Sequence, residues 1–75
     1  MLVKIIAFGQ IAEITGKDFT LEAHDITSLK ELLIAKFPAL SEKKYAIAIN
    51  KKLVATNVAL KENDTVALMP PYSGG

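Results

Sequence analysis

The feature that most constrains this fold is a single helical pattern with strand-like segments on both sides of it. Four apolar residues repeat at helical spacing and form one stripe: Leu29, Leu32, Leu33 and Phe37. Ser28 and Glu31 have the spacing of a capping box, and Thr27 offers an alternative cap one residue earlier. Pro38 ends the helix, because the residue before a proline is pushed out of the helical region. We therefore expect one main helix that packs against a sheet.

Five segments have the composition or the alternation of strands, and they cover residues 2–8, 19–23, 45–49, 53–55 and 65–69. In the first segment the odd-numbered residues are all apolar, whereas the even-numbered face contains Lys4. This parity predicts that the even-numbered face is the wetter one and that Phe8 is exposed. In the last segment, Val66 and Leu68 should point into the core and Met69 to the exposed face.

The connections between these segments are short. We expect a single turn at residues 11–15, a polar connector at residues 39–44, and a loop or one-turn helix at residues 57–63 with Leu60 pointing inward. The order strand, strand, helix, strand, short strand, strand predicts an α+β fold, a β-grasp roll with a mixed sheet of about five strands and one main helix. Residues 1–75 should form one such domain, with residues 70–75 as an extended C-terminal tail.

Composition argues against several classes of function. The chain has no cysteine and a single histidine, His24, which we interpret as a solvated loop residue, so we expect no metal site. The formal charge is +1, and all nine basic residues are lysines, which argues against nucleic-acid binding. Apolar runs are far shorter than a membrane span. We expect a cytoplasmic protein without bound cofactor. Because 51% of the residues of this short chain are hydrophobic, some apolar side chains should remain on the surface, where a partner can cover them.

The chain ends in Pro70, Pro71, Tyr72, Ser73, Gly74 and Gly75. The two prolines fix φ and remove two backbone donors, so this segment should leave the sheet as an extended tail. Gly74 and Gly75 have no side chains, which would let the terminal carboxylate pass through a narrow channel into the active site of another protein. The alternative is a frayed terminus without function.

Four stretches together resemble the small, sulfur-carrying subunit of molybdopterin synthase. They are residues 3–13, the helix opening Thr27-x-Leu29-x-x-Leu32, residues 46–50, and the ending from Asn63-Asp64-x-Val66 to Pro70-Pro71-x-Ser73-Gly74-Gly75. The resemblance covers essentially the whole chain. Two positions depart from the family pattern: Met69 stands where an aromatic residue is common, and Ala12 where an arginine is common.

The resemblance implies a carrier without catalytic residues of its own. An adenylyltransferase related to ubiquitin-activating enzymes would use ATP to adenylate Gly75, and sulfur would then replace AMP to give a thiocarboxylate. The tail, from Pro70 to Gly75, would enter the large subunit of molybdopterin synthase, where the sulfur converts cyclic pyranopterin monophosphate to molybdopterin. The resemblance also implies an assembly of two small and two large subunits, with Phe8, Leu53 and Met69 at the partner interface.

Two alternatives stay open at this point. Adenylation of a terminal Gly-Gly is shared with ubiquitin-like modifiers, which are conjugated to lysines, and with the sulfur carrier of the thiamine pathway. A plain interaction domain with an idle tail is a further reading of the same sequence.

Overall fold

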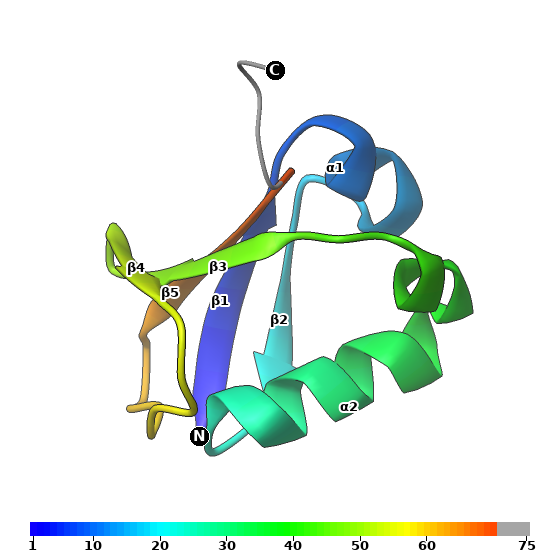
Figure 1. Cartoon of the computed structure of the whole chain (residues 1–75). Coiled ribbons are helices and arrows are strands. Elements are labelled where there is room, and N and C mark those ends of the chain that lie inside the picture. Colours follow the sequence, from blue (N-terminus) through cyan, green and yellow to red (C-terminus); the bar gives the residue numbers. More distant parts are fainter. Residues whose placement is uncertain (71–75) are drawn as a thin grey trace.

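The computed structural model describes residues 1–70 (Figure 1). In chain order, the elements are β1 (Leu2–Ala7), α1 (Gly9–Thr15), β2 (Asp18–Glu22), α2 (Ile26–Lys36), the 3₁₀ helix η1 (Pro38–Glu42), β3 (Ala46–Ile49), β4 (Lys52–Val54) and β5 (Thr65–Met69). The residues of the predicted tail that follow Pro70, namely Pro71, Tyr72, Ser73, Gly74 and Gly75, lie outside the described part of the chain.

Within residues 1–70, five strands form one mixed sheet in the order β2-β1-β5-β3-β4. The first and last strands, β1 and β5, run parallel at its centre, and the other neighbouring pairs are antiparallel. Helix α2 crosses one face of this sheet (Figure 1). The prediction of an α+β, β-grasp roll with one main helix is confirmed.

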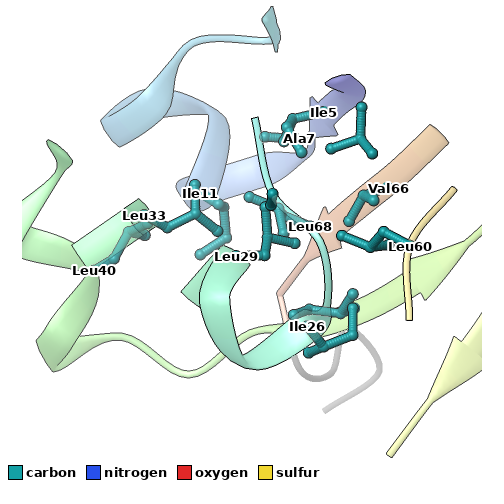
Figure 2. Packing of buried hydrophobic residues seen from close by; sticks show 13 residues of the cluster. Ile5, Ala7, Ile11, Ile26, Leu29, Leu33, Leu40, Leu60, Val66 and Leu68 are labelled. Carbon is teal, nitrogen blue, oxygen red and sulfur yellow. The ribbon is translucent and has the colours of Figure 1, made fainter. Parts of the chain in front are cut away.

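The core lies between α2 and the sheet face that α2 covers (Figure 2). Val3, Ile5 and Ala7 of β1 are buried, as the parity of the first strand predicts. Val66 and Leu68 of β5 are also buried, and Leu60 packs into the same cluster from the loop before β5. Each large side chain buried here stabilises the fold by roughly 1.5–3 kcal/mol. The apolar residues of alternate positions therefore fix which face of each strand meets the helix.

Helix α2 begins earlier than the sequence prediction. Its N-cap is Asp25, whose Oδ1 accepts a hydrogen bond of 2.8 Å from the backbone N–H of Ser28. The backbone N–H of Asp25 in turn donates to Ser28 Oγ at 3.2 Å. The capping residue predicted at Ser28 or Thr27 was wrong, because Ser28 occupies the third helical position and completes a box that Asp25 opens. The end of the helix before Pro38 is confirmed.

The buried stripe of α2 also differs from the prediction. Ile26, Leu29 and Leu33 are buried, whereas Leu32 is 40% exposed. Positions 26, 29 and 33 follow one another at spacings of three and four on one helix face and point to the sheet, whereas Leu32 lies at the edge of that face, toward solvent. Phe37, which follows the helix, packs edge-to-face on Phe19 of β2 with ring centroids 5.7 Å apart.

Two segments predicted without regular structure are helical. Residues 9–15 form the two-turn helix α1 in place of a single turn, and Ile11 is buried beneath it. The segment expected as a polar connector contains η1, which buries Leu40. Both predictions were wrong for the same reason. Both segments are too short to show a periodic signal in the sequence, yet each buries one side chain fully in the core, Ile11 in α1 and Leu40 in η1.

Candidate functional site

The face of the sheet opposite α2 carries the predicted docking residues. The register of β1 and β5 places Ile6 beside Ala67, and that of β3 places Ala48 beside both Ala67 and Leu53. Four strands, the β3–β4 turn and the residue that follows β1 line one depression, which we call the open-face hollow. Its nine residues are Ile6, Phe8, Ala48, Asn50, Lys51, Leu53, Thr65, Ala67 and Met69. Its lining is mostly apolar, as a protein-docking surface requires.

All three residues predicted at the partner interface belong to the open-face hollow. Phe8 is 49% exposed and Leu53 is 72% exposed, which confirms the predicted exposure of Phe8. Met69 is the last residue of β5 and is partly buried. The structure thus brings the three side chains to one surface beside the start of the tail, and their contact with a partner stays a prediction.

A hydrogen-bonded clamp holds the polar end of the hollow. Asn50 Nδ2 donates to Asp64 Oδ1 at 2.9 Å, and the N–H of Thr65 donates to Asn50 Oδ1 at 3.0 Å. Asp64 Oδ2 also accepts from the N–H of Lys61 at 2.8 Å. The backbone hydrogen bond from Lys61, followed by the bond from Asn50, holds the pKa of Asp64 below its ordinary value. The clamp ties the β3–β4 turn to the beginning of β5.

The sequence analysis missed this clamp. Asn50 and Lys51 form the turn with positive φ angles of 50° and 75°, a conformation in which asparagine is the most favoured residue after glycine. An Asn at the start of a two-residue turn was therefore a usable signal for the turn itself. Nothing local in the sequence pointed to its partner Asp64, which is 14 positions away.

The start of the tail lies against the start of α1. The N–H of Phe8 donates a hydrogen bond of 3.0 Å to the carbonyl of Leu68. This bond is the last one of the pairing between β1 and β5. Pro70 follows β5 and is partly buried. A Cβ built on Gly9 would lie 2.9 Å from Pro70 Cγ, so the proline ring occupies the space next to a residue that has no side chain. Nothing local in the sequence marks the contact of Gly9 with Pro70.

Acidic and imidazole groups do not gather into a site in the described part of the chain. Among residues 1–70 no group of three or more His, Asp or Glu side chains is arranged to hold a metal ion. The His24 side chain is 77% exposed, with Nε2 at 3.8 Å from Asp25 Oδ1. The N–H and hydroxyl of Ser28 are the main causes that hold the pKa of Asp25 below its ordinary value. The Asp25 carboxylate thus acts as the N-cap of α2.

The membrane question has a plain structural answer for the same part of the chain. No helix formed by residues 1–70 combines the length and the hydropathy that crossing a membrane requires.

Comparison with known proteins decides the family. The model of the ThiS family matches residues 5–75. The chain belongs to the ThiS family. This ThiS-family chain is 32% identical to the molybdopterin synthase sulfur carrier subunit of Escherichia coli (strain K12), over 99% of the chain and 100% of that protein. The resemblance to the small subunit of molybdopterin synthase is therefore confirmed.

Two solved structures extend the comparison. One is the complex of subunits 1 and 2 of molybdopterin-converting factor from Helicobacter pylori 26695, which matches with a TM-score of 0.79 and 33% identity over 100% of both chains. The other is the small archaeal modifier protein 1 from Methanosarcina acetivorans, with a TM-score of 0.82 and 23% identity over 99% of this chain and 96% of that one. The second likeness concerns the fold alone.

Proposed function

We propose that this chain is the sulfur carrier of a molybdopterin synthase and that the Gly75 carboxylate is its reactive group. The observation that carries the proposal is the match to the Escherichia coli sulfur carrier subunit along the full length of both proteins. The terminal Gly74-Gly75 supports it, because this chemistry needs an unhindered free carboxylate. Under this proposal the chain acts in the cytoplasm.

The chemistry follows from the poor reactivity of a carboxylate. An oxygen of Gly75 attacks the α-phosphorus of ATP on the activating enzyme, pyrophosphate leaves, and an acyl adenylate forms. A sulfur nucleophile then attacks the acyl carbon and AMP leaves, which yields the thiocarboxylate. On delivery, the sulfur moves to cyclic pyranopterin monophosphate and water restores the carboxylate oxygen. The carrier itself needs no acid, base or nucleophile beyond its own terminus, so the catalytic residues belong to the large subunit.

The open-face hollow supplies the docking surface in this proposal. The Helicobacter pylori structure is by its title a complex of two subunits, which supports a large-subunit partner for this chain. Phe8, Leu53 and Met69 would contact that partner beside the tail, which places the docking surface next to the reactive segment. We also propose an assembly of two small and two large subunits, as the family resemblance implies, and each molybdopterin then needs two deliveries of one sulfur atom.

The test is a measurement of intact mass. The purified chain is incubated with the activating adenylyltransferase, ATP and a sulfur source, and we expect the mass to rise by the exchange of one oxygen for one sulfur. Adding the large subunit and cyclic pyranopterin monophosphate should return the original mass and yield molybdopterin. A chain lacking Gly75 is the control. A modifier would instead accumulate on lysines of other proteins in a Gly75-dependent way, and a carrier of another pathway would form the thiocarboxylate but yield no molybdopterin.

A further inference from the structure

Gly9 and Pro70 are far apart in the sequence but meet where the chain leaves the sheet. A Cβ on Gly9 would lie 2.9 Å from Pro70 Cγ and 3.6 Å from Pro70 Cδ. Ordinary contact for a Cβ begins at 3.4 Å, so the shorter distance is about half an ångström too close. The neighbouring group is a closed ring, whose Cγ can move only by a change of ring pucker and not by the rotation about single bonds that is open to the end of a flexible side chain. The ring therefore packs against Gly9 more closely than any other residue at position 9 would permit.

The backbone groups on both sides of this contact cannot continue the pairing of β1 with β5. The carbonyl of Phe8 accepts hydrogen bonds from the N–H groups of Ile11 at 3.1 Å and Ala12 at 3.3 Å, so it belongs to α1 and is not offered to a continuing β5. Pro70 has no N–H to donate. The pairing of β1 with β5 therefore ends here, and Gly9, with φ at +55°, turns the chain into α1 directly beside the proline ring.

We propose that Gly9 is a positioning residue, whose bare Cα seats the Pro70 ring and thereby sets the direction in which residues 71–75 leave the sheet. This inference rests on the proposed function, because the direction matters only when the Gly75 carboxylate must reach the active site of another protein. Five residues span at most ~18 Å when fully extended, so an error of direction at Pro70 grows along the segment. A misplacement of about 1 Å at a reacting atom can cost as much as ~100-fold in rate.

The experiment compares sulfur delivery by the normal chain and by Gly9→Ala. Both are prepared as thiocarboxylates, bound to the large subunit, and mixed with cyclic pyranopterin monophosphate in a single turnover. We expect Gly9→Ala to slow delivery on the order of tenfold, while the Kd of the complex with the large subunit stays unchanged. An unchanged rate in Gly9→Ala, with normal delivery by the unsubstituted chain, overturns the inference and leaves the proposed function standing. Failure of the unsubstituted chain to deliver sulfur overturns the proposed function itself.

Gly16→Ala is the matched control. Gly16 lies at the other end of α1 with φ at +94°, and a Cβ there would meet nothing within 4 Å. This variant carries the backbone strain of a side chain at positive φ without any contact to Pro70. We expect it to lower the urea midpoint of unfolding and to leave the rate of delivery unchanged. Equal slowing by both variants would mean that strain in α1 is the cause, and the inference would be wrong.

A double-mutant cycle tests whether Gly9 acts through Pro70. In a Pro70→Ala background the ring atoms that the new Cβ would meet are gone, so Gly9→Ala should add little further slowing to that of Pro70→Ala alone. The same fold-change for Gly9→Ala in both backgrounds would overturn the inference. Where Gly9→Ala does not fold, Pro70→Ala alone decides the matter: it should slow delivery while the Kd is kept, and a normal rate would refute the proposed seat.

Discussion

Replacing Phe8 with alanine should weaken the complex with the large subunit more than it weakens the fold. The Phe8 side chain is 49% exposed, so only about half of its surface is buried by the isolated domain. Burying a whole phenylalanine is worth ~1.5–3 kcal/mol, and the truncation should therefore cost the isolated domain no more than about 1.5 kcal/mol. The other half of the ring is free to be covered by a partner in the open-face hollow.

The expected loss of affinity is larger than this loss of stability. Aromatic anchors at the centre of an interface commonly cost ~2 kcal/mol or more on truncation, which corresponds to about a 30-fold rise in Kd. Titration calorimetry with the purified large subunit measures this rise, and urea unfolding of the isolated chain measures the stability. The two measurements together separate a docking residue from a core residue.

Leu2→Ala is the matched control for this experiment. Leu2 is 44% exposed, shares the even-numbered parity of Phe8, and lies at the start of β1, the end of that strand remote from the tail. Its truncation removes a comparable exposed apolar group and should leave the Kd unchanged. A loss of ~3 kcal/mol or more in the unfolding free energy of Phe8→Ala would contradict the reasoning, because that cost is typical of a buried phenylalanine. An unchanged Kd would contradict it as well.

Three further outcomes are expected. Extending the chain by one residue beyond Gly75 should abolish sulfur delivery and leave the urea midpoint unchanged; delivery at a normal rate would refute the role of the free terminus. Leu29→Ala removes a fully buried side chain and should cost ~2–5 kcal/mol of unfolding free energy, measured by urea titration. Because the folded-state pKa values of Asp25 and Asp64 are lowered, their contribution to stability is complete above the ordinary aspartate pKa of about 4 and is lost as the pH falls below it. Asp25→Asn should therefore flatten the acid side of a stability-versus-pH curve.

The strands and their faces could be predicted because alternation is a local property. The apolar odd-numbered residues of β1 and the position of Lys4 sufficed to place Phe8 on the open face, and the same parity placed Met69 there. The start of α2 could not be fixed in this way, since Asp25 and Ser28 were both competent capping residues and the sequence offers no measure of which one caps. With a later helix start, the predicted stripe left out Ile26, which is buried, and it included Leu32, which is 40% exposed.

The docking surface was predictable only in part. Parity placed Phe8 and Met69 on the exposed face, but Leu53 was assigned from the family resemblance alone. The clamp of Asn50 on Asp64 depends on the pairing of β3 with β5 and leaves no pattern in either segment. Contacts between strands that are distant in the chain are set by register, and register is visible in the sequence only through the alternation of apolar residues.

The contact of Gly9 with Pro70 shows why the parallel pair at the centre of this sheet matters for a carrier. In a parallel pair the carboxyl ends of both strands meet at the same edge, so the segment that follows β1 and the segment that follows β5 begin side by side. The segment after β1 turns at once into α1, and the first residue of α1, Gly9, lies against Pro70. Had β1 and β5 been antiparallel, the tail would have left the sheet beside the start of β1, where Met1 and not a rigid helix is the neighbour. The topology thus places Gly9 beside Pro70, the residue after which the proposed reactive segment begins, and only a residue without a side chain can pack so closely there.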